Sequence, residues 1–267
     1  MTSQASSLNL ENVVYEKKGP IAYVTINRPQ VLNALNQKTW QELGVAFTEV
    51  RDDSTVMGAI LTGSGDKAFI AGADIGEMVA VTAVEAHQNA KRAHSVLNLI
   101  EDLGKPVIAA VNGFALGGGC ETATACTIRL AAEEARFGQP EVKLGIMPGG
   151  GGTQRLPRLV GKGIALQLIL SGETITAQEA YRIGLVNEVV ARPQLMLRAE
   201  QILRQIGSNA PLAVKFSINA MNRGLDASQD EGLLIESSLF AICAATEDKK
   251  EGTTAFLEKR TPKFLGR

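Results

Sequence analysis

The chain has 267 residues, 45% of them hydrophobic, and a formal net charge of −1. This length allows one large domain or about two small ones, and the lack of a basic excess argues against nucleic acid as the main partner. No apolar run reaches the roughly 18 residues of a membrane span, so we expect no membrane partner. The three cysteines lack CxxC spacing, which argues against a disulfide framework or a metal site and fits a cytoplasmic location.

The first part of the chain predicts a strand followed by a helix. Residues 1–8 are small and polar, and we expect a frayed tail without a secretory signal. A β-rich run at residues 21–26 enters a turn at residues 27–29. Asn36 is the predicted N-cap of a helix whose apolar residues recur at helical spacing. These residues are Trp40, Leu43, Phe47 and Val50.

A second unit begins with a short buried strand at residues 58–62 and continues into the sequence AFIAGADIGEM at residues 68–78. Ala71, Gly72 and Ala73 permit a tight backbone whose N–H groups face a ligand, or merely a tight turn that ends a strand. Thr82 and Glu85 form a capping-box pattern at the start of a long helix. The expected buried side of this helix contains Val84, Ala93, Val96, Leu97 and Ile100.

The third unit combines a glycine turn with two carboxylates. A strand at residues 106–111 runs into three glycines at residues 117–119, and a helix-like segment begins at Cys120 and Glu121. Two further strands, 127–131 and 135–138, lead to a turn that presents Glu141. Backbone N–H groups ahead of a helix approach ligands closely, and carboxylates beside such donors suit acid–base chemistry on a polarised carbonyl. Each glutamate alone is better explained as structural, and the two together favour a functional site.

After Gly161 the sequence becomes mostly helical. We expect helices at residues 164–170, 195–206, 211–223, 229–246 and 249–259. Thr176 and Glu179 form another capping-box pattern, and Gly184 is a plausible helix stop. The strand–turn–strand–helix alternation before this region predicts a spiral or layered α/β fold. We place a boundary near residues 191–193, which gives an α/β core at residues 1–192 and a helical region at residues 193–267.

Two other kinds of site fit the sequence poorly. A phosphate loop is absent, and the relaxed GxGxxA match that starts at Gly63 continues as apolar chain instead of opening a helix. There is no GxSxG nucleophile motif, and the only histidines, His87 and His94, lie on one surface-type helix. Cys120 could act as a thiol nucleophile, but such a cysteine is more often a small packing residue.

At these motifs the chain strongly resembles the enoyl-CoA hydratase (crotonase) family. The resemblance covers nearly the whole chain, at residues 24–36, 68–78, 105–121, 136–161 and 251–264. It implies an α/β crotonase-type spiral of repeated ββα units with a C-terminal helical region that mediates oligomerisation. It also implies an acyl-CoA substrate, assembly as a homotrimer or dimer of trimers, and no cofactor, since coenzyme A is part of the substrate.

The resemblance also assigns residues to roles. Glu121 and Glu141 match the family's pair of catalytic glutamates, and the backbone N–H groups of Ala73 and Gly118 match its oxyanion hole. The residues it implies for binding substrate or coenzyme A are Ala71, Ala73, Asp74, Ile75, Gly76, Gly118, Gly149, Phe256 and Lys259. Gly76 stands where the family often has lysine, so a contact to the phosphate or acyl group would be lost there.

The reaction implied by this pair of glutamates is reversible addition of water to a 2-trans-enoyl-CoA, as in fatty-acid β-oxidation. We expect Glu121 to act as the ionised base, because a helix N-terminus favours its charged form. Glu141 would then be the protonated acid, with a raised pKa. A 3,2-enoyl-CoA isomerase or another acyl-CoA lyase of the family is the alternative, and a non-catalytic scaffold of the same fold is an alternative of a different class.

Overall fold

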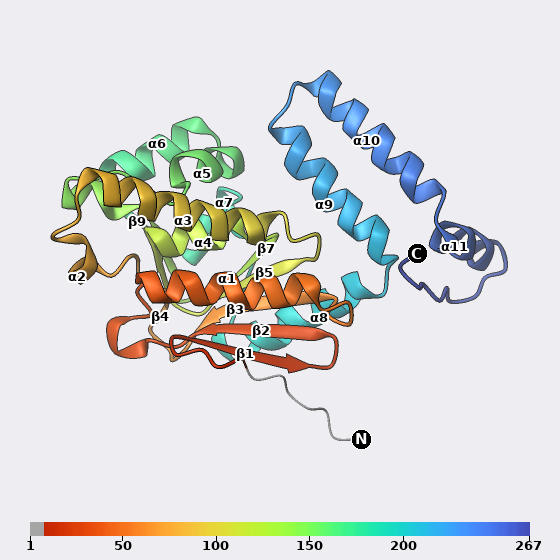
Figure 1. Cartoon of the computed structure of the whole chain (residues 1–267), viewed down its shortest axis with the longest axis horizontal. Coiled ribbons are helices and arrows are strands. Elements are labelled where there is room, and N and C mark those ends of the chain that lie inside the picture. The colour runs from red at the N-terminus through yellow and green to blue at the C-terminus, as the bar shows by residue number, and fades with distance from the viewer. Residues whose placement is uncertain (1–7) are drawn as a thin grey trace.

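The computed structural model describes residues 8–267 and contains two β-sheets (Figure 1). The larger sheet has six strands in the order β1-β2-β3-β5-β7-β10. Its members are β1 (Val13–Lys18), β2 (Ile21–Ile26), β3 (Gly58–Gly63), β5 (Val107–Val111), β7 (Ile128–Ala132) and β10 (Glu188–Val190). The β1–β2 pair is antiparallel, and every other pair in this sheet is parallel.

The smaller sheet has the order β4-β6-β8-β9, and only its β8–β9 pair is antiparallel. Its strands are β4 (Ala68–Ile70), β6 (Phe114–Leu116), β8 (Arg136–Gly138) and β9 (Thr174–Thr176). The chain passes from the large sheet to the small one three times, from β3 to β4, from β5 to β6 and from β7 to β8. This repeated passage confirms the predicted spiral and places the loops after β4, β6 and β8 side by side.

Helices surround these sheets and form the end of the chain. They are α1 (Gln37–Asp52), α2 (Ile75–Met78), α3 (Ala83–Glu101), α4 (Gly118–Ala125), α5 (Gly152–Val160), α6 (Lys162–Ser171), α7 (Ala177–Arg182), α8 (Leu195–Gly207), α9 (Pro211–Leu225), α10 (Gln229–Ala244) and α11 (Glu247–Leu257). Short 3-10 helices span η1 (Pro29–Val31), η2 (Pro140–Leu144) and η3 (Arg192–Gln194). Among residues 8–267, no helix combines the length and the apolar character needed to cross a membrane.

The four central strands of the large sheet, β2, β3, β5 and β7, are buried on both faces, as expected for mostly parallel strands. On one face, Ile60 and Ile108 belong to the same buried cluster as Leu195 and Leu203 of α8. The other face contributes to the main core, which also contains Phe47 of α1 and residues of α3. The small sheet and α4 close this core from the opposite side, so Glu121 of α4 is buried within it.

Helix caps follow the sequence closely, with one exception. Asn36 accepts from the Thr39 N–H at 2.9 Å, and Thr82 forms the complete predicted capping box with Glu85. Thr176 accepts from the Glu179 N–H, but the reciprocal bond is missing because Arg182 binds the Glu179 carboxylate instead.

The predicted burial of Val84 is wrong, since its side chain is 67% exposed. Residues 83–88 are all exposed, so the first turns of α3 extend past the core.

The last three helices extend away from the core (Figure 1). Helices α9 and α10 pack mainly against each other, and α10 buries none of its residues. Large apolar side chains therefore remain exposed on α9, α10 and α11. They include Met221, Leu225, Leu233, Leu234, Phe240, Ile242, Phe256 and Leu257.

Candidate active site

A cavity of about 670 Å³ opens where the loops after β4, β6 and β8 meet. Its lining includes Ala73, Gly118, Glu121 and Glu141, four residues that are spread over 69 positions of the sequence. The predicted catalytic and oxyanion residues are thus brought together in one cavity. Cys120, by contrast, is fully buried, and burial raises the pKa of its thiol to about 12, so it packs in the core as an inert thiol.

Two backbone N–H groups lie close together in the wall of this cavity. Ala73 lies in the loop between β4 and α2, and Gly118 is the first residue of α4. A methyl group built on Gly118 would lie only 3.9 Å from the Ala73 nitrogen. No residue within the described range 8–267 accepts a hydrogen bond from either N–H. Two unpaired donors in close proximity, one at a helix N-terminus, can bind a developing oxyanion.

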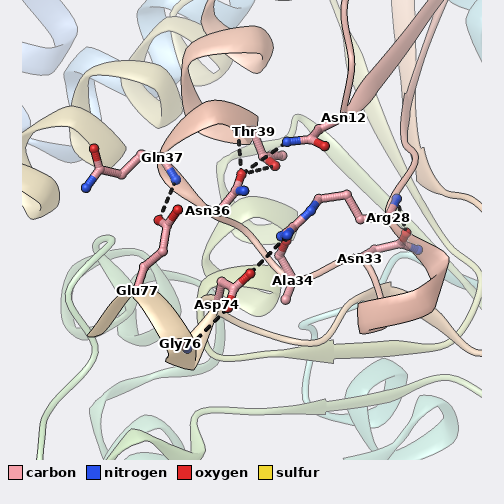
Figure 2. A network of polar contacts seen from close by, with 10 residues as sticks. All are labelled: Asn12, Arg28, Asn33, Ala34, Asn36, Gln37, Thr39, Asp74, Gly76 and Glu77. Atoms are coloured by element: carbon pink, nitrogen blue, oxygen red, sulfur yellow. Dashed lines mark hydrogen bonds and ion pairs between the residues drawn. The ribbon is translucent and has the colours of Figure 1, made fainter. Parts of the chain in front are cut away.

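A polar network holds the Ala73 loop in place (Figure 2). Arg28, two residues after β2, donates to the Ala34 carbonyl at 2.5 Å and forms an ion pair with Asp74 at 3.0 Å. The Asp74 carboxylate also accepts from the Gly76 N–H and caps α2. Main-chain bonds from Leu35 to Gly72 and from Asp74 to Leu35 complete the attachment. These bonds use the Gly72 carbonyl oxygen and the Asp74 N–H on either side of Ala73 and leave the N–H of Ala73 free.

Glu121 lies in the first turn of α4, and only 3% of it is exposed. Its Oε1 atom accepts hydrogen bonds from the N–H groups of Gly150 and Gly152, both at 2.7 Å. Burial raises the pKa of Glu121, while these two N–H groups act in the opposite direction by stabilising the charged form. The carboxylate is therefore fixed through one oxygen, and its other oxygen, Oε2, has no hydrogen-bond partner among residues 8–267.

Glu141 is the second residue of η2, and its partly buried side chain lies beside Gly117 of the glycine turn. Burial, reinforced by the negative charge of Glu121, raises the pKa of Glu141 to about 7. The amide of the buried Gln139 faces this carboxyl, at 2.9 and 3.2 Å from its two oxygens. The nitrogen of the amide is assigned to this side, because the amide oxygen would otherwise face only acceptors and the nitrogen only donors. A Cβ on Gly117 would lie 2.9 Å from Oε1, so glycine leaves room for the carboxylate.

The other predicted binding residues divide into two groups. Ala71, Asp74, Ile75 and Gly149 line the same cavity, and Gly76 adjoins it in the first turn of α2. Phe256 and Lys259 do not line the cavity of their own chain, because they lie at and just beyond the end of α11, fully outside the core. A role for this pair would require a second copy of the chain.

Sequence reasoning missed the residues that position the glutamates. Gln139, Gly150 and Gly152 contact the two carboxyl groups, and Arg155 binds the loop that contains the two glycines. The run of four glycines at residues 149–152 was a usable signal, since glycine N–H groups commonly approach anions closely. The partner of each N–H could not be identified, because Glu121 lies about 30 positions earlier in the chain.

The fold and this site match one protein family. The sequence profile described as "Enoyl-CoA hydratase/isomerase" matches residues 16–267, which covers nearly the whole chain. The chain therefore belongs to the enoyl-CoA hydratase/isomerase family.

Individual relatives are similar over almost their full length. The chain is 54% identical over 253 residues to "Short-chain-enoyl-CoA hydratase" of Clostridium acetobutylicum, covering 95% of this chain and 97% of that one. It is 52% identical to "Crotonyl-CoA hydratase" of Syntrophomonas wolfei, covering 96% and 99%. Among solved structures, the enoyl-CoA hydratase from Bacillus anthracis superposes with a TM-score of 0.92 at 39% identity, covering 96% of this chain and all of that one.

Proposed function

We infer that the chain is an enoyl-CoA hydratase, a hydro-lyase that adds water reversibly across the 2,3 double bond of a 2-trans-enoyl-CoA to give a 3-hydroxyacyl-CoA. Relatives named for short-chain enoyl-CoA and crotonyl-CoA support a short acyl chain. The observation that carries the inference is the arrangement of two carboxyl groups and two free N–H donors around one cavity. This arrangement provides both polarisation of a carbonyl and proton transfer.

In the proposed mechanism, the thioester carbonyl oxygen accepts hydrogen bonds from the N–H groups of Ala73 and Gly118. Polarisation of this carbonyl withdraws electron density from C3 of the conjugated substrate, so that water can attack there. Negative charge then collects on the thioester oxygen, where the two backbone donors stabilise it. Such preorganised donors are commonly the largest single contribution to acyl-transfer and enolate chemistry.

Glu121 is the proposed base. Its ionised form is stabilised by two loop N–H groups at 2.7 Å, in addition to its place in the first turn of α4. The stabilisation thus comes from the loop at residues 149–152 as well as from the helix N-terminus on which the sequence argument rested. Burial raises the pKa of this carboxyl, which makes it a stronger base once it is ionised. Its free oxygen, Oε2, is available to orient water.

Glu141 is the proposed acid. A pKa of about 7 keeps a large fraction of this carboxyl protonated at neutral pH, so it can deliver a proton to C2. In the dehydration direction the same group removes the C2 proton, and Glu121 returns a proton to the leaving hydroxyl. After hydration Glu121 is protonated and Glu141 is ionised. The pair returns to its starting state when Glu121 releases its proton to solvent and Glu141 takes one up.

Binding of coenzyme A is proposed to begin at the Ala71–Ala73 backbone, with Asp74, Ile75 and Gly149 forming nearby walls of the cavity. Gly76 offers no side chain to a phosphate or acyl group.

We further propose a homotrimer or dimer of trimers, supported by the exposed apolar residues of α9, α10 and α11. Burying them between subunits would bring Phe256 and Lys259 to a neighbour's coenzyme A. The three free cysteines support a cytoplasmic location.

The experiment that tests this proposal uses Glu121→Gln and Glu141→Gln, which keep the side-chain volume but remove acid–base function. Loss of crotonyl-CoA absorbance measures hydration, and a 3-enoyl-CoA measures isomerisation. Each substitution should slow hydration by about a hundred- to ten-thousandfold. An isomerase would instead lose activity on the 3-enoyl-CoA in one variant and remain nearly unchanged in the other. Two folded variants with unchanged rates would show that both glutamates are structural, whereas a native chain with neither activity would support a non-catalytic scaffold.

A further inference from the structure

The loop at residues 149–152 determines where the Glu121 carboxylate lies. Its Gly150 and Gly152 N–H groups bind one carboxylate oxygen. A Cβ on Gly150 would lie 2.5 Å from the other oxygen, so the loop backbone packs directly against the carboxylate. Any shift of this loop therefore moves Glu121 or removes the bonds that stabilise its charge.

Arg155 holds this loop from the side away from the cavity. It lies in the first turn of α5, and its guanidinium turns back so that Nη1 donates to the Gly150 carbonyl at 3.2 Å. Nη1 also packs against Gly151, where a Cβ would overlap it. Gly151 has a φ of +106°, a conformation that glycine adopts easily and other residues rarely do. Arg155 thus binds the loop at two adjacent residues.

The guanidinium is anchored to α3 as firmly as to the loop. Both Nε and Nη2 lie 2.8 Å from the same oxygen of Glu101, and Nη2 donates to Asn98 at 2.5 Å. Only 11% of the Arg155 side chain is exposed, and its planar set of donors is well matched to three acceptors at fixed positions. Arg155 does not line the cavity, so it can act on the substrate only through the loop and Glu121.

We propose that Arg155 is a positioning residue for the hydration step, which clamps the loop at residues 149–152 between α3 and α5 and so fixes the Glu121 carboxylate toward C3. The proposal rests on the proposed function, because it requires Glu121 to act on water. Ala73 lies in the loop after β4, Gly118 is the first residue of α4, and Glu141 belongs to η2. None of these three residues is hydrogen-bonded to Arg155 or to the loop at residues 149–152, so we expect the clamp to act on Glu121 rather than on them. The positive charge of Arg155 also opposes the effect of burial on the pKa of Glu121.

The clamp should therefore affect one half of the reaction selectively. Removal of the C2 proton from a saturated acyl-CoA, measured as exchange with deuterated water, uses Glu141 and the oxyanion donors but no attack of water at C3. Hydration of crotonyl-CoA uses all of these groups and Glu121. A displacement of a reacting group by about 1 Å can cost a hundredfold in rate. We expect Arg155→Met to lower kcat for hydration about ten- to a hundredfold, with KM and C2 exchange little changed.

The test compares Arg155→Met with Arg158→Met, a matched control one turn later on α5. Arg158 is half-exposed and pairs with Asp226 rather than with the loop, so its loss should leave both assays unchanged. Glu101→Gln, at a more exposed position, serves as a second variant that keeps Arg155 but weakens its anchor. It should reduce hydration about three- to tenfold, again without loss of C2 exchange.

Selective loss of hydration in Arg155→Met and Glu101→Gln supports the proposal. Unchanged hydration in both variants overturns it, and so does a parallel loss of hydration and C2 exchange in folded protein, which would indicate a general structural role. Glu121→Gln and Glu141→Gln are measured beside them. If Glu121→Gln keeps full hydration activity, the proposed function of Glu121 fails first. If Glu121→Gln is inactive but Arg155→Met is not, the failure belongs to the clamp alone.

Discussion

Gly119 of α4 and Ile70 of β4 are in backbone contact so close that a Cβ on Gly119 would overlap the Ile70 carbonyl oxygen. This contact joins the two segments that carry the proposed oxyanion donors, because Gly118 and Ala73 lie one and three positions away. Only glycine permits such an approach. The contact therefore sets how close the two N–H groups can come to each other.

Gly119→Ala should separate these segments. Overpacking of a buried site typically costs about 1–3 kcal/mol of folding stability, and here it would also widen the gap between the two donors. We expect a lower melting temperature together with a fall in kcat/KM on crotonyl-CoA. Gly163→Ala is the control, since its Cβ would meet nothing within 4 Å in an exposed first turn of α6. Native activity in Gly119→Ala would show that the donor spacing is not critical.

Ala73→Pro should remove one oxyanion donor without removing a hydrogen bond that holds the fold together. The neighbouring bonds of this loop use the N–H groups of Leu35 and Asp74, and none uses that of Ala73. Loss of one such donor typically costs about a hundred- to a thousandfold in turnover. Circular dichroism checks the fold, and crotonyl-CoA hydration measures the loss.

Ala71→Pro provides the contrast at nearly the same place. The Ala71 N–H donates to the Leu32 carbonyl at 3.1 Å, so proline there removes a structural hydrogen bond. This variant should lose thermal stability more than Ala73→Pro does. If Ala73→Pro instead retains native turnover while folded, Ala73 has no part in the mechanism.

The ion pair between Arg28 and Asp74 should matter for catalysis although neither group is a proposed acid or base. Arg28→Met removes the attachment of the Ala73 loop to β2, and we expect kcat/KM to fall about tenfold through misplacement of one donor. Arg51→Met is the control, since Arg51 pairs with its neighbour Asp52 on the surface. Combined with Asp74→Asn, the effects should be less than additive, because both changes remove the same interaction. Full additivity would argue against the coupling.

The sequence predicted the fold and the chemical groups better than their positioning. The glycine turn before Glu121 and the AFIAGAD segment are local signals, and each predicted residue of the pair Ala73 and Gly118 lines the cavity. The bonds from Gly150 and Gly152 to Glu121 span about 30 positions, and the Arg28–Asp74 pair spans 46. Such contacts arise only when the spiral stacks its turns, so no local pattern encodes them. The wrong prediction that Val84 is buried also reflects missing long-range information, because helical spacing does not show where along α3 the contact with the core ends.

The raised pKa of Glu141 should appear in the stability of the protein as a function of pH. A carboxyl with a folded pKa of about 7 and an unfolded value of 4.5 binds its proton more tightly in the native state. Between these two pH values the unfolded state binds fewer protons at Glu141 than the folded state does. The contribution of Glu141 to the free energy of unfolding therefore declines as pH rises from 4.5 to 7. Below 4.5 the contribution is fully present.

Glu141→Gln removes this titration and keeps the shape of the side chain. Melting temperatures measured between pH 4.5 and 8 should therefore fall more steeply for the native protein than for the variant, and the two curves should run parallel above about pH 8. Glu133→Gln, at an exposed position just after β7, controls for a general loss of negative charge. The same proton governs catalysis, so kcat/KM for hydration should decline as pH rises through about 7 in the native protein. Parallel melting curves across the whole range would mean that Glu141 is already ionised at pH 5, and it could not then be the acid that protonates C2.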